Sequence, residues 1–424
     1  MIKELLTKKF VRDNLVLFTG TLILNVFGFL FHFYMGRSLG PEGYGILGAL
    51  LSIVYFMIVP TNTIQTGIAK FSMLFNAKKE YGKIRYLFAK SVKRLLLTGI
   101  IGGIIFALMT PFIADFLNMD VSSLVVISFF MLFALLVPIN RGILQGVQDF
   151  KSLSVNLAVE GVIKLLAGVL FVALGYGVNG ALGAIIASYI VVFFIGLKPL
   201  SEILKKESSR AIDTREVYSY SLPLLIMVLS LTLFYSVDMV LVKHFFSSVD
   251  AGYYSAISLI GKILFFGSMS ISQVMFPKVA ELYHLGKGHK KLMYKSLGVI
   301  FLLVIPAVII YFLIPDFIIT LLYGKEYLPI SPLLGWFGLF IGLVCFIYLI
   351  AFYNISINKK KFLWILGLFN LIEISAVWFF HNSLFQVIQS LTITMFLLFV
   401  ILSIDVIFSK DGKNGKTIGN NPCV

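Results

Sequence analysis

Twelve apolar stretches, each long enough to cross a bilayer, follow one another through this chain of 424 residues. A helix needs about 20 apolar residues to cross the hydrocarbon core, where every backbone polar group must be satisfied within a helix or a closed barrel. Only 13% of the residues are charged, against about 25% in an average soluble protein. The sequence therefore predicts an all-α polytopic membrane protein and excludes a soluble globular one. The predicted spans are 15–36, 43–69, 92–114, 121–144, 152–175, 178–198, 217–242, 251–277, 292–315, 329–354, 361–381 and 384–408.

Positive charges divide the connections between spans into two classes. Thirty of the 35 Lys and Arg residues lie at connections or termini on one side, three lie on the other side, and two lie within spans. Because Lys and Arg accumulate on the cytoplasmic side of a membrane, we predict a protein of the cytoplasmic membrane with both termini in the cytoplasm. This division also explains the net charge of +15, so we expect no nucleic-acid partner.

The two halves of the chain resemble each other at an offset of about 205–209 residues. Segment 40–52 aligns with 248–260, and segment 64–75 aligns with 271–283. An even number of spans separates equivalent points, so the halves are predicted to be parallel repeats, two six-helix bundles around a central cavity. The predicted domains are an N-terminal bundle at 1–200, a cytoplasmic linker at 201–216, a C-terminal bundle at 217–409 and a disordered cytoplasmic tail at 410–424.

Three segments carry a family resemblance. FHFYMGRSLGPEGYGILGALLS (31–52), the basic connection after the second span and GILQGVQDFK (142–151) resemble the polysaccharide-biosynthesis flippases of the multidrug/oligosaccharidyl-lipid/polysaccharide exporter superfamily. The resemblance extends over most of the chain in topology and length. It implies movement of polyprenyl-diphosphate-linked oligosaccharide through a cationic cavity by ion-driven alternating access. Lipid II flippases of this superfamily usually have fourteen spans, so twelve predicted spans argue against that branch.

Several polar residues that lie within or at the ends of the spans are candidates for binding substrate. A charge at the centre of a bilayer costs at least about 2.5–3.5 kcal/mol, so such residues normally face a bundle interior or a watery cavity. Lys164 and Lys262 lie near mid-depth in opposite halves, and we predict that they bind the diphosphate, with Asn25 beside them. Arg37 and Arg141 are further candidates at span ends, where their side chains are expected to extend to the interface.

Three carboxylates within spans are candidates for coupling to an ion. Glu160 shares a helix face with Lys164, and the alternative is that the two merely neutralise each other. Glu373 lies near mid-depth, whereas Asp238 lies nearer the outside and either binds the coupling cation or pairs with Lys243 or Lys262. The coupling ion is H⁺ or Na⁺, and no other cofactor is predicted.

Three functions are compatible with this organisation. A lipid-linked oligosaccharide flippase, acting as a monomer near glycosyltransferases or a polymerase, explains the lysines in the spans best. A cation-coupled multidrug exporter of the same fold would favour carboxylates and aromatic residues without cations. An integral-membrane glycan polymerase would need catalytic residues on sizeable outer loops, and the predicted outer connections are very short. We therefore predict a transporter and not an enzyme.

Overall fold

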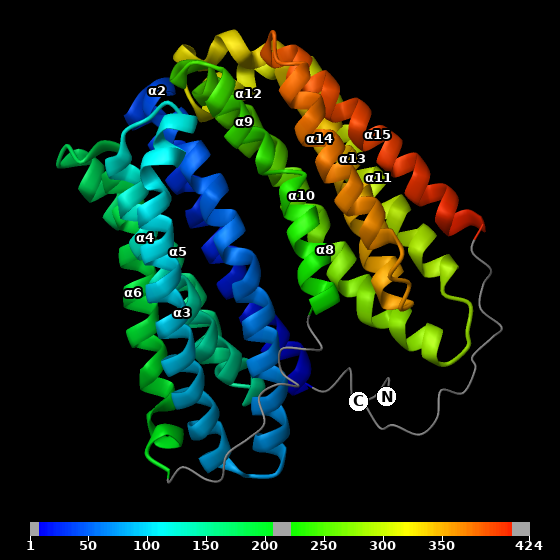
Figure 1. The fold of residues 1–424 in the computed structure, drawn as a ribbon. Coiled ribbons are helices and arrows are strands. Elements are labelled where there is room, and N and C mark those ends of the chain that lie inside the picture. Colours follow the sequence, from blue (N-terminus) through cyan, green and yellow to red (C-terminus); the bar gives the residue numbers. More distant parts are fainter. Residues whose placement is uncertain (1–7, 207–221, 409–424) are drawn as a thin grey trace. The chain divides into compact units, whose positions relative to one another are not determined.

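The computed structural model describes residues 8–206 and 222–408, and all the regular secondary structure in these two ranges is helical (Figure 1). Eleven helical segments of the described chain are long and apolar enough to cross a membrane, which confirms the predicted all-α membrane fold. The elements are α2 (Lys8–Ala77), α3 (Tyr81–Phe116), α4 (Val121–Gly146), α5 (Phe150–Ala173), α6 (Gly177–Leu204), α8 (Leu222–Leu233), α9 (Val237–Phe245), α10 (Ser248–His284), α11 (Lys290–Leu313), α12 (Pro315–Leu322), the 3₁₀ helix η1 (Lys325–Leu333), α13 (Leu334–Ser356), α14 (Phe362–Phe379) and α15 (Leu384–Phe408).

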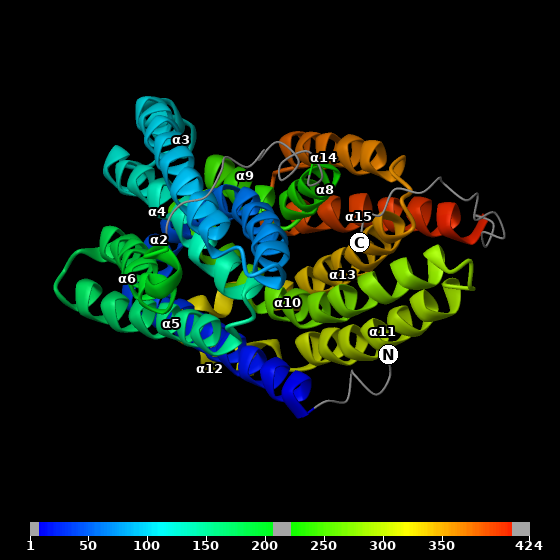
Figure 2. The same cartoon turned by 90° about the horizontal axis from the view of Figure 1, so that it is seen from below.

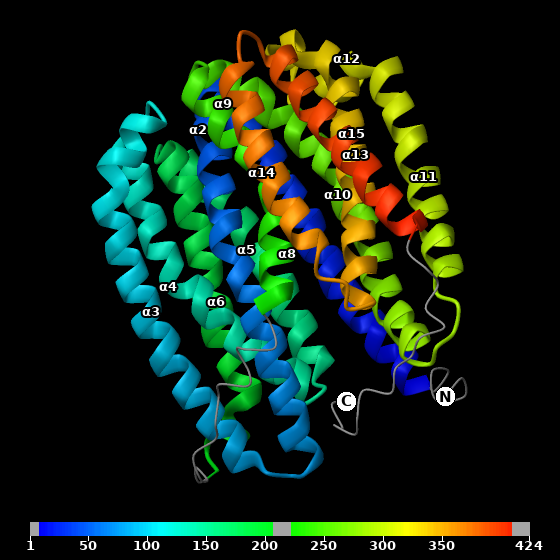
Figure 3. The ribbon, with the colours of Figure 1, turned by 45° about the vertical axis from the view of Figure 1, so that its right-hand side comes forward.

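Helix α2 contains the first two predicted spans. Its 70 residues would extend about 105 Å if they were straight, more than three times the thickness of the hydrocarbon core. At Gly40 the backbone leaves the helical region, with φ 64°, a left-handed value that glycine adopts without steric cost. This break divides α2 into a first arm before Gly40 and a second arm after it, drawn in dark blue and lighter blue in Figure 3. With α2 counted as two crossings, the described chain has the twelve spans that were predicted.

Two predicted spans are not continuous α-helices. The described part of span 217–242 consists of α8 and α9, which are separated by a turn at 234–236. Span 329–354 begins as the 3₁₀ helix η1, and α-helical structure starts only at Leu334. Pro329 and Pro332 explain this start, because proline has no backbone N–H for the α-helical hydrogen-bond ladder.

The chain divides into two compact units. Unit 1 comprises residues up to Leu225 together with Phe246–Gly252, and unit 2 comprises Ile226–Phe245 and the residues from Tyr253 onward. The predicted linker at 201–216 falls mostly outside the described residues, and the predicted tail at 410–424 falls wholly outside them. The predicted domain boundaries therefore stay a prediction.

Each unit has its own arrangement of packed helices. In unit 1, α5 packs against α2 and α6, and α4 packs against α2, α3 and α6. A Cβ atom on Gly161 of α5 would lie 3.0 Å from the Cα atom of Leu24, so the glycine allows α5 to approach the first arm of α2 closely. In unit 2, α13 lies between α11 and α15, as the end-on view in Figure 2 shows, and α14 packs against α15 and α9.

The predicted sidedness can be tested at the two ends of α6. This helix has 28 residues, about 42 Å in length, so its ends must lie on opposite sides of a bilayer. Reporter fusions at Lys205 are expected to show a cytoplasmic location, and fusions at Asn179 an external one, as should fusions at Asn382 in the short connection before α15. A cytoplasmic signal from Asn179 would show that the assignment from positive charges is wrong.

Candidate functional site

A buried polar cluster joins α4, α5 and α6 in unit 1. The guanidinium of Arg141 donates from Nε to Asn156 Oδ1 at 2.8 Å and from Nη2 to Glu160 Oε2 at 2.5 Å. Asn156 in turn donates from Nδ2 to the carbonyl oxygen of Val192 at 2.7 Å. Arg141, Asn156 and Glu160 are all buried. The ion pair therefore has the additional hydrogen bonds that make a buried charge pair tolerable.

The location of Arg141 corrects two sequence expectations. Arg141 does not extend to the interface, because its side chain is only 8% exposed and points from α4 toward α5. Glu160 forms its ion pair with this arginine, so Lys164 is not its ion-pair partner, although the two groups still interact electrostatically. The partner of Glu160 is 19 residues away in sequence, beyond the reach of any pattern within a single helix.

Lys164 lies one helical turn beyond Glu160 and is half-buried. Its Nζ atom is 5.8 Å from the centroid of the Phe31 ring, a distance that permits a cation–π interaction. A Cβ atom on Gly28 would lie 3.5 Å from the same Nζ, so the ammonium group occupies the space beside a glycine. Lys164 interacts electrostatically with Glu160, whose charge is offset by Arg141. The formal charges of Arg141, Glu160 and Lys164 therefore leave one net positive charge in this part of unit 1.

The other two candidates of unit 1 are exposed. Asn25 lies three residues before Gly28 on the first arm of α2, so it is one helical turn from the position that Lys164 Nζ approaches. Arg37 lies near the end of the same arm and is exposed. The first arm of α2 thus brings Asn25 near Lys164, whereas Arg37 is about two and a half turns further along the helix from Gly28.

An acidic cluster lies inside unit 2. Asp238 of α9 and Glu373 of α14 are both fully buried, at 0% exposure. Tyr254 of α10 donates its hydroxyl hydrogen to Asp238 Oδ2 at 2.7 Å. Asp238 also interacts electrostatically with Glu373 and with Lys262. The cluster therefore brings together two of the three predicted coupling carboxylates, whereas Glu160 belongs to the cluster of unit 1.

Several oxygen atoms around this cluster have no hydrogen-bond partner among the described residues. They are Ser236 Oγ, Asp238 Oδ1, Asn370 Oδ1 and both carboxyl oxygens of Glu373. Ser236 lies in the turn that interrupts α8 and α9, and interrupted helices mark ion and substrate sites in membrane transporters. An isolated buried carboxylate is very costly in free energy, so these oxygens are suited to accept a proton or to bind a cation.

Lys262 differs from Lys164 in its surroundings. It is buried, and its Nζ atom is 5.9 Å from the centroid of the Tyr235 ring, in the turn between α8 and α9. Because Asp238 interacts with it electrostatically, its charge belongs to the acidic cluster. The formal charges of Lys262, Asp238 and Glu373 sum to one net negative charge.

Tyr254 was not among the predicted site residues. It lies four and eight residues before Ser258 and Lys262, so the three side chains share one face of α10. On α14, Asn370 and Val377 are buried on the same helix face as Glu373.

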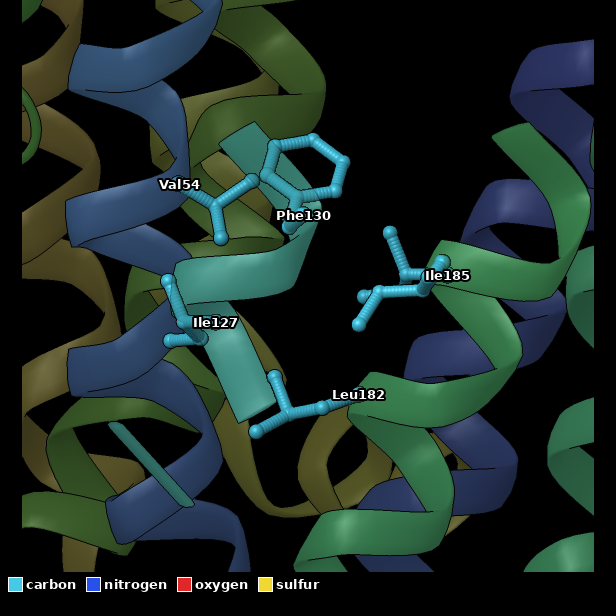
Figure 4. Close-up of a pocket in the computed structure, with 6 residues that line it drawn as sticks. Val54, Ile127, Phe130, Leu182 and Ile185 are labelled. Carbon is cyan, nitrogen blue, oxygen red and sulfur yellow. The ribbon is translucent and has the colours of Figure 1, made fainter. Parts of the chain in front are cut away.

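The small cavity of unit 1 in Figure 4 is not a ligand site. It measures about 10 Å³ and is lined only by apolar side chains, among them Val54, Phe130 and Leu182. A buried water needs at least about 10–15 Å³ and polar partners, so this space is a packing defect.

The described residues contain no group of three His, Cys, Asp or Glu side chains suited to a metal ion. A cation in unit 2 would therefore need hydroxyl or amide oxygens as well as the two carboxylates.

Comparison with known proteins identifies related sequences. The family model of the polysaccharide biosynthesis proteins matches residues 34–332. An uncharacterized membrane protein of Methanocaldococcus jannaschii is 26% identical over 64% of this chain and 68% of its own length. The capsular polysaccharide biosynthesis protein CapF of Staphylococcus aureus is 23% identical over 50% of this chain and 54% of its own. The lipid II flippase MurJ of Bacillus subtilis is 23% identical over 84% of this chain and 74% of its own.

Solved structures share the fold. An inward-facing multidrug resistance transporter of the MATE family, in the MOP superfamily, has a TM-score of 0.73 at 13% identity and covers 90% of this chain and 94% of its own. A lipid II flippase MurJ in an inward closed conformation has a TM-score of 0.70 at 14% identity and covers 91% and 87%. The chain therefore has the two-bundle fold of these transporters.

Proposed function

We propose a function from the premise that this chain belongs to the polysaccharide biosynthesis protein family: it is a flippase that moves polyprenyl-diphosphate-linked oligosaccharide across the cytoplasmic membrane. The names of two relatives support this, since one is a lipid II flippase and the other a capsular polysaccharide biosynthesis protein. Transporters of the same fold are known in inward- and outward-facing conformations, which supports alternating access as the mechanism.

The single observation that carries the proposal is the unneutralised cation in unit 1. Lys164 is half-buried within a span, while the nearby carboxylate of Glu160 is already paired with Arg141. The head of a lipid-linked glycan begins with a diphosphate, whose charges cannot cross about 30 Å of hydrocarbon without compensation. Lys164 supplies a positive charge for the diphosphate. Asn25 supplies an exposed amide about one helical turn from Gly28, the residue that Lys164 Nζ approaches. Arg141 then acts as a positioning residue that holds Glu160 away from Lys164.

The acidic cluster of unit 2 supplies the coupling to an ion. Asp238 and Glu373, with their unpartnered oxygens beside an interrupted helix, bind H⁺ or Na⁺ and release it during the cycle. Lys262 lies next to this cluster, so we assign it to the ion site and not to the diphosphate. In this proposal the positive site of unit 1 and the negative site of unit 2 have separate tasks.

A cation-coupled multidrug exporter is the second candidate, favoured by the likeness to MATE transporters. The acidic cluster has the correct charge for a cationic drug. However, Asp238 and Glu373 are both at 0% exposure, which leaves no room for a drug molecule beside them. A glycan polymerase is less suitable, because the described connections at the predicted outer side, such as 174–176 and 380–383, are short.

The proposal is tested by reconstituting the full chain in vesicles with a fluorescent polyprenyl-diphosphate-linked oligosaccharide. The expected result is movement between leaflets that depends on the protein and increases when an H⁺ or Na⁺ gradient is imposed. Export of cationic dyes from the same vesicles, without movement of the glycolipid, would support the multidrug alternative instead.

Lys164 gives a sharper test of the substrate site. Replacing Lys164 by Ala is expected to lower the initial rate of glycolipid movement about ten- to hundredfold, the range expected for one lost hydrogen bond to a charged group. Lys164→Arg should retain part of the rate, because the positive charge is kept although its shape differs. Lys151 lies on the same helix and is exposed, so Lys151→Ala is the matched control and should move glycolipid at the normal rate. Equal rates for the Lys164→Ala and Lys151→Ala variants would remove Lys164 from the site.

A further inference from the structure

A second cavity, in unit 2, has a lining unlike that of either charged cluster. It measures about 300 Å³ and lies between α14 and α15, at the lower end of the roughly 300–1,000 Å³ usual for small-molecule sites. Its polar lining is contributed by Gln386, Gln389, Ser390 and Thr394 of α15, and the ring of Phe380 forms part of the wall. None of the lining residues is charged.

The polar groups of the cavity include both donors and acceptors. Ser390 donates its hydroxyl hydrogen to the carbonyl oxygen of Val387, and Thr394 donates its own to the carbonyl oxygen of Ser390, each at 2.8 Å. The two hydroxyl oxygens therefore remain as acceptors. The Oε1 atom of Gln386 accepts a hydrogen bond from the backbone N–H of Asn382 at 2.9 Å. The amide NH₂ group of Gln386 therefore remains as a donor.

This lining discriminates among the parts of a lipid-linked glycan. A diphosphate needs compensating positive charge, and the cavity has none. A polyprenyl chain offers no hydrogen bonds, so binding it would leave the amide NH₂ groups of Gln386 and Gln389 without partners, which is costly. A neutral sugar ring has hydroxyl groups that both donate and accept, together with an apolar face that can pack against the Phe380 ring. The cavity is also much larger than a single ion requires.

We infer that this cavity binds a neutral sugar residue of the transported glycan, a subsite for the carbohydrate that is separate from the cation of unit 1. The inference rests on the proposed flippase function. The cavity extends from Phe380 and Gln386, beside the 380–383 connection that positive charges place at the outer side, to Thr394. It therefore serves the sugars near the outer end of unit 2, where the glycan leaves the protein.

Two lipids and two variants test the subsite in the full chain held in lipid nanodiscs. The lipids are polyprenyl diphosphate bearing a neutral trisaccharide and the same polyprenyl diphosphate without sugar. The test variant combines Gln389→Leu with Thr394→Val, which removes an exposed amide and a buried hydroxyl at nearly constant volume. The control is Thr392→Val. It removes a hydroxyl that likewise bonds to its own helix, to the carbonyl oxygen of Ile388 at 2.7 Å, but does not line the cavity.

The expected result is that the test variant binds the trisaccharide lipid about tenfold more weakly than the parent, as expected for one or two lost hydrogen bonds. Its affinity for the lipid without sugar should be unchanged, and the control should match the parent for both lipids. Equal affinities of parent and test variant for the trisaccharide lipid would overturn the subsite while leaving the flippase function intact. A loss of the same size for both lipids would overturn it as well, and would indicate that the cavity holds the hydrocarbon chain. If the correctly folded parent binds neither lipid, the proposed function itself fails.

Discussion

Replacing Arg141 by Ala is expected to destabilise the protein by about 3–5 kcal/mol, because it leaves the Glu160 carboxylate buried without its partner. Glu160 is 6% exposed, and its ion pair with Arg141 is 2.5 Å long. The amide oxygen of Asn156 would lose its hydrogen bond as well. The unfolding midpoint of the purified variant, and the fraction recovered as a single species by size-exclusion chromatography, should both fall sharply.

Two companion variants show whether this loss comes from the unpaired charge. Arg37→Ala removes an arginine that is exposed, and such surface changes usually alter stability by no more than about 0.5 kcal/mol. The double change Arg141→Met with Glu160→Met should recover most of the lost stability, because a buried ion pair can often be replaced by apolar residues. An unfolding midpoint of the Arg141→Ala variant equal to that of the parent would contradict the buried pair.

Replacing Glu373 by Gln is expected to abolish the response of transport to the ion gradient. One ion moving down a potential of about 100 mV contributes about 2.3 kcal/mol, a factor of roughly 45 in the distribution of the substrate. The variant should lose this factor and only equilibrate the glycolipid between leaflets. Glutamine keeps the shape of the side chain but can neither bind a proton nor carry the negative charge that binds a cation. Asp238→Asn should behave in the same way, because both carboxylates belong to one cluster.

The measurement is glycolipid accumulation in vesicles with an imposed H⁺ or Na⁺ gradient. Glu326 lies in η1 and is exposed, so Glu326→Gln is the matched control in the same unit and should retain the full response. Tyr254→Phe removes only the hydroxyl group that donates to Asp238, and should give an intermediate loss. A normal gradient response in both the Glu373→Gln and the Asp238→Asn variants would exclude the acidic cluster from coupling.

The clusters in the two units change the interpretation of the charged residues that lie within the spans. From the sequence, Glu160, Glu373 and Asp238 were predicted as coupling residues, and Lys164 and Lys262 as the cations that bind the diphosphate. The contacts within each unit group them differently, since Glu160 is held by Arg141 and Lys262 interacts with Asp238. On this grouping we propose Lys164 for the substrate and the pair of carboxylates in unit 2 for the ion.

The sequence alone determined the membrane fold, the position of the spans and the residues that could not be left in contact with lipid. Hydropathy is a sum over neighbouring residues, so each apolar stretch predicts a span without knowledge of the rest of the chain. The cost of an ionisable group in hydrocarbon is equally local, and for this reason the burial of Glu160, Lys262 and Glu373 could be expected from their positions. The kink of α2 was also accessible, because Gly40 and Pro41 interrupt the apolar pattern between two spans.

Only the tertiary structure decided which charges meet. The partner of Glu160 depends on how α4 and α5 are rotated about their axes, and the periodicity of one helix carries no information about the rotation of another. The same holds for the hydroxyl that Tyr254 donates to Asp238 and for the cavity between α14 and α15. The turn at 234–236 contains neither proline nor glycine, so nothing local required it. These features arise from contacts between residues far apart in the sequence, because pairing energy depends on distance and burial in three dimensions.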